Sequence, residues 1–141
     1  MFGVDSLNIV VIDGQGGGIG KCLVEQIRTS IPKAEIIAIG TNSIATSAML
    51  KAGATMAATG ENSVVVTCKK ADIITGPVGI VLTDSMLGEI TEKMTHAITT
   101  SSARRILIPV SKCNTRIAGL PEKPLSKYIE SAVEQIKEFY N

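Results

Sequence analysis

The chain has 141 residues, the usual size of one domain, and 45% of them are hydrophobic against 19% charged. A net charge of +1 and an aromatic content of 3% leave neither the basic surface nor the stacking side chains that nucleic-acid binding requires, so we expect no nucleic-acid partner. No apolar run approaches the length of a membrane span and no secretion signal is recognisable, so we expect no membrane partner and a cytoplasmic protein.

Short apolar runs alternate with helical patterns through the first half of the chain. Leu7–Ile12 is a β-branched run that ends at Asp13 and Gly14, and it predicts a central strand buried on both faces of a sheet. The apolar spacing that follows predicts a helix that continues to Ser30 and ends before Pro32. The same unit then repeats as a strand at Glu35–Ile39, a helix at Ile44–Lys51, a weak strand at Ala54–Ala58 and a helix from Glu61 or Asn62 toward Lys70.

The second half of the chain continues the alternation. Asp72–Thr75 predicts a fourth strand that Gly76 and Pro77 end, and Gly79–Leu82 either extends it or forms a separate apolar segment. The remaining predicted elements are a helix at Ile90–Thr100, a fifth strand at Arg105–Val110, a short edge strand at Arg116–Leu120 and a last helix from Pro124 with the apolar stripe Leu125, Ile129, Val133 and Ile136.

Strands and helices that alternate with short links indicate parallel strands joined by right-handed crossovers. We therefore predict an α/β fold of three layers, a doubly wound, mostly parallel and Rossmann-like sheet of about five or six strands. No second domain or linker is recognisable, so residues 1–141 are expected to form one domain. The strand order stays open between the Rossmann and the flavodoxin-like arrangements.

A glycine-rich loop follows the first predicted strand and leads into a helix. Five of the seven residues from 14 to 20 are glycine, which is entropically costly unless the backbone has to turn tightly or approach a ligand. Amides at a helix N-terminus favour an anion, so the loop predicts a phosphate-binding site; the alternative is that the glycines only permit close packing of the helix. The predicted cofactor contacts in this loop are Gly14, Gln15, Gly16, Gly17, Gly18, Ile19 and Gly20.

The dinucleotide-binding motif G-x-G-x-x-G is incomplete in this loop. Ile19 or Lys21 stands at its last glycine position, depending on which glycine is taken as the first. The spacing of Gly14, Gly18 and Gly20 instead gives G-x-x-x-G-x-G, which looks like the loop of short-chain dehydrogenases.

The Walker motif is incomplete as well. It fails by one residue, and Cys22 stands where a magnesium-binding hydroxyl is required. Gly17–Lys21 resembles the deviant Walker loop of ParA-like ATPases, whose signature lysine would here be Gly16. These two departures argue against triphosphate chemistry.

Three further segments are predicted to lie at the carboxyl edge of the sheet, where open α/β sheets bind ligands. They follow the second, third and fourth strands, and their candidate contacts are Thr41, Asn42, Thr59, Gly60, Gly76 and Pro77. The second strand lacks the acid that usually binds the ribose of a dinucleotide. For the first two segments the alternative is helix capping, and for the third it is a plain turn.

Asp13 ends the first strand beside the glycine loop. Its carboxylate is expected to accept hydrogen bonds from loop amides; the alternatives are a Mg²⁺ ligand or an obstacle to phosphate binding. Asp84, Ser85 and Glu89 precede a predicted helix and are interpreted as capping rather than catalytic residues.

The cysteines are odd in number, widely spaced and never in C-x-x-C, so we expect reduced thiols and no metal site. Cys22 is predicted to be buried by its apolar periodicity. Cys113, with Asn114, follows the fifth strand and is the better candidate for a functional thiol, although a plain loop cysteine is the simpler interpretation. His96 has no recognisable partner, and no catalytic residue is predicted.

Several segments together resemble a compact bacterial family catalogued as a domain of unknown function. The matching runs are Ile12–Lys21, Gly40–Asn42, Ala45–Thr46, Met49–Ala54, Ala58–Asn62, Ala71–Ile74, Gly76–Pro77, Ser85–Glu89 and Leu107–Pro109. The resemblance implies a Rossmann-like fold over nearly the whole chain, and it implies no activity or substrate.

The sequence favours a nucleotide-binding protein that takes NAD(P) or another small-molecule nucleotide. The first alternative is a small NAD(P)-dependent oxidoreductase, with its site at the carboxyl edge or across a homo-oligomer. Against this alternative, the chain lacks the Tyr-x-x-x-Lys signature of short-chain dehydrogenases, because Ala132 stands four residues after Tyr128. The second alternative is a non-enzymatic interaction module, with oligomerisation as its main property.

Overall fold

The structure is a computed structural model that describes residues 7–110 and 115–140. In this part of the chain five parallel strands form one sheet in the order β3-β2-β1-β4-β5. The strands are β1 (Asn8–Asp13), β2 (Glu35–Gly40), β3 (Met56–Thr59), β4 (Ile73–Pro77) and β5 (Arg104–Ile108). The helices are α1 (Gly18–Ser30), α2 (Ser43–Lys51), α3 (Glu61–Cys68), the 3₁₀ turn η2 (Val78–Val81), α4 (Glu92–Thr100) and α5 (Leu125–Glu138).

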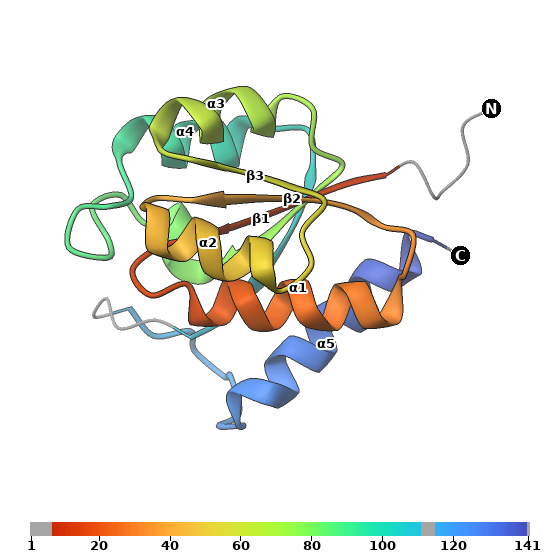
Figure 1. Cartoon of the computed structure of the whole chain (residues 1–141). Helices are drawn as coiled ribbons and strands as arrows, with labels where there is room; N and C mark the ends of the chain where they lie inside the picture. The colour runs from red at the N-terminus through yellow and green to blue at the C-terminus, as the bar shows by residue number, and fades with distance from the viewer. Residues whose placement is uncertain (1–6, 111–114, 141) are drawn as a thin grey trace.

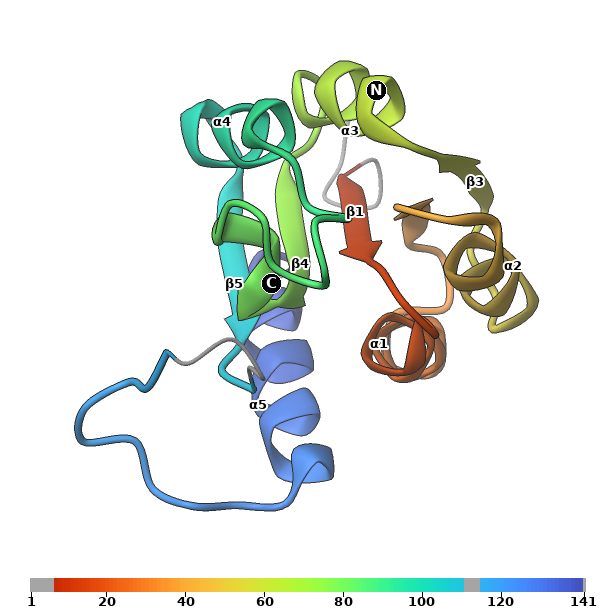
Figure 2. The same ribbon diagram turned by 90° about the vertical axis from the view of Figure 1, so that its left-hand side faces the viewer.

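Helices cover both faces of the sheet and make three layers (Figures 1 and 2). The predicted doubly wound α/β fold is therefore confirmed. The order β3-β2-β1-β4-β5 is the Rossmann order, which settles the alternative that the sequence left open. None of the helices in the described ranges is both long and apolar enough to cross a bilayer.

The central strand β1 shows why this sequence forms a buried sheet. Ile9 and Val11 pack under α1, α2 and α5, whereas Val10 and Ile12 pack under α3 and α4. Successive side chains of a strand point to opposite faces, so a continuous β-branched run is stable only where both faces are covered. All four side chains are fully buried.

The position of β1 in the sheet also determines where the strand order reverses. The strands β1, β2 and β3 follow one another toward one edge, and β4 pairs on the other side of β1. The carboxyl ends of β1 and β4 therefore lie at the point where the strand order reverses, which is the usual ligand site of such sheets.

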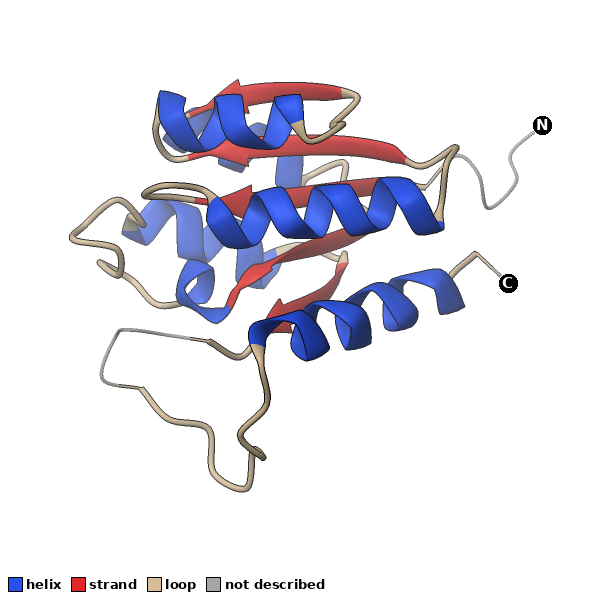
Figure 3. Ribbon diagram, turned by 60° about the horizontal axis from the view of Figure 1, so that its bottom comes forward, coloured by secondary structure: helices blue, strands red, loops and turns tan. Residues whose placement is uncertain are grey.

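Two sequence predictions in the second half need correction or refinement. Of the two alternatives for Gly79–Leu82, the separate apolar segment is the correct one, since the 3₁₀ turn η2 starts directly after Pro77 and β4 is not extended. Arg116–Leu120 was expected to be an edge strand and is not one: these residues are exposed, and Leu120 N donates to Ile117 O in a turn. The segment extends away from the sheet before α5 (Figure 3), so no neighbouring strand supplies its hydrogen bonds.

Thr75 on β4 gives a stability prediction. Its hydroxyl is fully buried and has no hydrogen-bond partner among the described residues. Thr75→Val keeps the shape and removes the desolvated hydroxyl, so we expect the free energy of unfolding in urea to rise by about 1 kcal/mol.

Thr95 is the matched control for this prediction. It is also buried, but its hydroxyl lies 2.8 Å from Thr83 Oγ1 and donates to Glu92 O at 3.0 Å. Thr95→Val is expected to lower the free energy of unfolding by about 1 kcal/mol. Equal losses in both variants would mean that the Thr75 hydroxyl is hydrogen-bonded after all.

Candidate functional site

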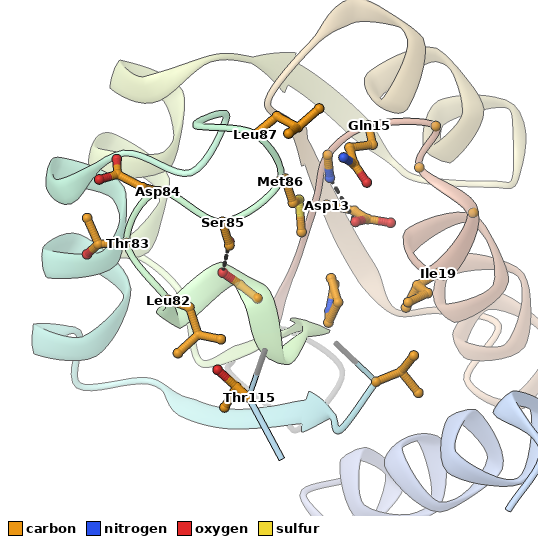
Figure 4. A pocket seen from close by; sticks show the side chains of 17 residues that line it. Asp13, Gln15, Ile19, Leu82, Thr83, Asp84, Ser85, Met86, Leu87 and Thr115 are labelled. Atoms are coloured by element: carbon orange, nitrogen blue, oxygen red, sulfur yellow. Dashed lines mark hydrogen bonds between the residues drawn. The ribbon is translucent and has the colours of Figure 1, made fainter. Parts of the chain in front are cut away.

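A pocket of about 970 Å³ lies at the carboxyl ends of β1 and β4 (Figure 4). Ligand sites commonly occupy volumes of about 300 to 1,000 Å³ at this place in the fold. The lining residues come from the glycine loop, from the turn after β4, from the loop before α4 and from the chain after β5. They are Asp13, Gly14, Gln15, Gly16, Gly17, Gly18, Ile19, Pro77, Gly79, Leu82, Thr83, Asp84, Ser85, Met86, Leu87, Val110 and Thr115.

The glycine loop is held as a tight turn that leads into α1. Gly17 N donates to Gly14 O at 2.9 Å, and Lys21 N donates to Gly17 O at 2.8 Å. Gly17 has a left-handed backbone with φ of 73°, and a Cβ there would lie 2.8 Å from the Cα of Ala45 on α2. Close packing therefore requires glycine at this position.

Gly16 and Gly18 have a different environment. Both are exposed, and a Cβ at either position would meet nothing within 4 Å. Neither residue has a positive φ. Packing and backbone conformation therefore do not explain why these two positions are glycine, whereas they do explain Gly17.

Three residues that line the pocket have backbone amides without an acceptor among the described residues. The N-cap residue Gly17 offers no side chain to α1, and the N–H groups of Gly16, Gly18 and Ile19 have no hydrogen-bond partner among the described residues. The first amides of a helix lack intrahelical acceptors, and the helix dipole adds positive potential at the same place. The arrangement is suited to bind an anion.

Asp13 organises this loop, as the sequence predicted. Its buried carboxylate accepts hydrogen bonds from Gly14 N and Gly20 N, both at 2.7 Å, and so joins the two ends of the glycine loop. Burial raises the pKa of this carboxyl, the two amides offset part of that rise, and the carboxylate of Glu89 adds to it. Since both oxygens already accept amides, Asp13 is poorly placed to hold a metal ion.

Glu89, interpreted from the sequence as a capping residue, joins the glycine loop to the end of β2. Its Oε1 accepts hydrogen bonds from Gln15 N at 2.9 Å, from Asn42 Nδ2 at 2.8 Å and from the Thr41 hydroxyl at 2.5 Å. Burial alone would raise the pKa of Glu89, but the hydrogen bonds from Thr41, Gln15 and Asn42 outweigh it and hold the pKa below the ordinary value of 4.5. Glu89 lies 74 positions beyond Gln15, so no local pattern indicated this contact.

The hydrogen bonds of Glu89 give a pH prediction. A lowered folded-state pKa contributes stability that is present above pH 4.5 and is lost as the pH falls through the folded pKa. The raised pKa of Asp13 changes the free energy of unfolding with pH in the opposite sense. Glu89→Gln is expected to lower the free energy of unfolding by about 0.5 to 1 kcal/mol near neutral pH, since solvent screens this half-buried carboxylate, and by less near pH 4. Urea unfolding of both proteins at the two pH values measures the difference; a pH-independent difference would contradict the assignment.

The interpretation of Asp84, Ser85 and Glu89 as helix caps is wrong. The cap of α4 is Thr91, whose side chain accepts a hydrogen bond from Met94 N. The three predicted residues lie in the preceding loop, which folds back over the glycine loop instead of leading directly into the helix.

This loop has an unusual backbone. Asp84, Met86 and Leu87 are non-glycine residues with left-handed φ values of 67°, 57° and 57°. The Ser85 hydroxyl donates to Gly79 O at 2.5 Å, and Asp84 N donates to Ile90 O at 2.7 Å, which fixes the loop. The Leu87 side chain is 98% exposed. Strained backbone of this kind concentrates at ligand sites, and here it borders the pocket.

The structure separates the other predicted contacts. Of the contacts predicted after the second, third and fourth strands, Pro77 lines the pocket. The others, Thr41, Asn42, Thr59, Gly60 and Gly76, do not. Asn42 caps α2 by accepting from Ala45 N at 2.9 Å, so the capping alternative applies to it. The Thr59 hydroxyl lies 2.7 Å from the Thr46 hydroxyl, and Gly60 precedes α3 as its N-cap.

The predicted thiol and imidazole groups lie elsewhere. Cys113 and Asn114 are outside the described residues. Cys22 is half-buried rather than buried. His96 lines a separate groove between α3 and α4 together with Cys68, and burial raises the pKa of the Cys68 thiol to about 11. No cluster of three or more potential metal-ligating side chains occurs in the part of the chain that the structure describes.

The strand order, the glycine loop after β1 and the pocket at the reversal point define a Rossmann-like α/β domain. The chain belongs to the family described as Domain of unknown function (DUF3842), whose model matches residues 8–141. This confirms the family resemblance. No curated protein matches the chain. Among solved structures the chain is similar to a dodecameric FMN-dependent UbiX-like decarboxylase from Escherichia coli O157:H7, with 14% identity, a TM-score of 0.44 and coverage of 92% of this chain and 75% of that chain.

Proposed function

We propose that the protein binds a nucleotide by its phosphate group, in the pocket between the glycine loop and the loop before α4. The observation that carries the proposal is that Gly16, Gly18 and Ile19 line the pocket and that their amides have no acceptor among the described residues. Each amide–phosphate hydrogen bond is charge-assisted and contributes about 1.5 to 3 kcal/mol.

The absence of side chains at Gly16 and Gly18 supports the same proposal. Glycine costs about 0.5 to 1 kcal/mol relative to alanine in regular structure, and at these two positions no contact of the protein requires it. A phosphate that approaches the backbone closely does require it, because a Cβ would stand between the ligand and the amides.

The remaining pocket wall suits the rest of a nucleotide. Apolar side chains of Leu82, Met86 and Val110 offer surface to a planar base, and the hydroxyls of Thr83 and Thr115 border the same space. The proposal is a binding function, and it assigns no catalytic residue. The expected homo-oligomer and cytoplasmic location stay predictions.

A thermal-melting screen tests the proposal. The probes are NAD(H), NADP(H), FMN, AMP, GTP, ATP with Mg²⁺, S-adenosylmethionine and inorganic phosphate. A ligand present at 100 times its Kd is expected to stabilise the fold by about 2.7 kcal/mol, which raises Tm by several degrees. If none of the probes shifts Tm and calorimetry detects no heat of binding, the proposal is overturned.

A further inference from the structure

The two halves of the glycine loop are covered differently. A Cβ at Gly14 would lie 2.5 Å from Thr41 Oγ1, 2.8 Å from Met86 Sδ and 3.0 Å from Glu89 Oε1, so side chains fill the space beside it. At Gly16 and Gly18 the corresponding space is open. The loop therefore offers a ligand only its second half.

The side of the loop that is covered is the side toward β2. Dinucleotide-binding Rossmann domains place the ribose of the adenosine half at the carboxyl end of β2, where an acid accepts its hydroxyl. In this chain Thr41 and Asn42 follow β2, and both donate to Glu89. Glu89 also accepts the Gln15 amide, so the loop before α4 is anchored across the place where that adenosine would lie.

Among the described residues, the side that is not covered leads toward β4 and β5. Its apolar surface comes from Ile19, Pro77, Leu82, Leu87 and Val110, which suit the faces of a single planar ring. Together with the three amides that have no acceptor among the described residues, this space offers partners for one phosphate and one ring.

The charges of the pocket limit how much negative charge a ligand can carry. The described residues that line it include two carboxylates, Asp13 and Asp84, and neither lysine nor arginine. A phosphate here is held only by amides and the helix dipole, whose capacity is small compared with the charge of a triphosphate chain. The charge of the pocket therefore disfavours a nucleoside triphosphate, whereas a phosphomonoester and the pyrophosphate diester of a dinucleotide carry about the same total charge. The preference for a mononucleotide rests on the covered β2 side of the loop.

Resting on the proposed function, we infer that the ligand is a mononucleotide-like phosphomonoester of a planar ring, and that Glu89 excludes the adenosine half of a dinucleotide. Glu89 is thus a specificity-determining residue, which acts by holding the loop before α4 over the β2 side of the glycine loop.

Isothermal titration calorimetry with two matched sets of ligands tests this inference. The first set is AMP, NMN and NAD⁺, and the second is FMN and FAD, so that each dinucleotide is compared with its own halves. We expect at least one mononucleotide to bind the wild type at least about 10-fold more tightly than the dinucleotide that contains it, a difference of about 1.4 kcal/mol.

Glu89→Ala removes all three hydrogen bonds and is expected to reduce this preference to less than about 3-fold by admitting the dinucleotide. Glu25→Ala, at an exposed position of α1 away from the pocket, should leave the preference unchanged. If circular dichroism shows that Glu89→Ala is not folded, Thr41→Val, which removes one donor to Glu89, replaces it with the same direction of change.

The outcomes separate the inference from the proposed function. Equal affinity of the wild type for mononucleotides and dinucleotides overturns the inference and leaves phosphate binding intact. Binding of inorganic phosphate without binding of any mononucleotide does the same. A preference that persists undiminished in folded Glu89→Ala overturns the role of Glu89. If neither inorganic phosphate nor any of the five nucleotides binds, the proposed function itself fails.

Discussion

Gly18→Val is expected to lower the affinity for a phosphate-bearing ligand by about 100-fold or more without unfolding the protein. Gly18 lines the pocket and a Cβ there meets nothing within 4 Å, so the valine side chain would occupy open space beside the phosphate that we propose. It would hold the phosphate away from the amides of Gly16, Gly18 and Ile19. Losing two charge-assisted hydrogen bonds costs about 3 kcal/mol or more, which corresponds to at least about 100-fold in Kd.

The stability of this variant distinguishes lost binding from lost folding. Gly18 is the first residue of α1 and has no positive φ, so a side chain there meets neither a clash nor backbone strain. Gln26→Val introduces the same side chain at an exposed position of the same helix and is the matched control, with unchanged affinity expected. Calorimetry and urea unfolding of both variants provide the measurement. Wild-type affinity in folded Gly18→Val would rule out the glycine loop as the phosphate site.

Gly76→Ala is expected to abolish folding or to lower the free energy of unfolding by more than about 4 kcal/mol. A Cβ at Gly76 would lie 2.2 Å from the carbonyl oxygen of Ile12 on β1, and a backbone atom in the centre of a sheet has no room to move. The φ of 156° adds backbone strain for a residue with a side chain. The two central strands would have to separate to accept the methyl group.

Gly16→Ala is the control for the effect of adding a methyl group. Its Cβ meets nothing within 4 Å, so the free energy of unfolding should stay within about 0.5 kcal/mol of the wild type. Circular dichroism and urea unfolding compare the two variants. A Gly76→Ala protein that is as stable as Gly16→Ala would contradict the close packing of β4 on β1.

The sequence predicted the elements of the fold well because the spacing of its apolar residues indicates which faces are buried. The β-branched run of β1 and the repeated apolar spacing of α1 are local signals that survive in the structure nearly residue by residue. Strand order was not predictable, since β1 pairs with β4 across more than sixty positions of sequence. The prediction of a strand at Arg116–Leu120 was wrong because the local composition fits a strand, but none of the described strands lies beside it to pair with.

The sequence predicted the glycine-loop side of the pocket but not the side formed by the loop before α4. The glycine loop and Pro77 were found because glycine and proline mark the ends of parallel strands, which meet at one edge of the sheet. Glu89 and Met86 reach the loop by folding back from a distant segment whose left-handed residues carry no glycine signature except at Gly88. No acid follows β2 in the sequence, and only the tertiary structure brings the carboxylate of Glu89 to Thr41 and Asn42 at the end of that strand.

The most direct test of the phosphate cradle is nuclear magnetic resonance of the ¹⁵N-labelled chain during titration with FMN and, separately, with inorganic phosphate. The amide signals of Gly16, Gly18 and Ile19 are expected to move most, because their N–H groups gain a charged acceptor, whereas Gly53 and the residues of the groove between α3 and α4 should not move. Saturable shifts confined to that groove, or no shift of the three amides with a ligand that calorimetry shows to bind, would contradict the account.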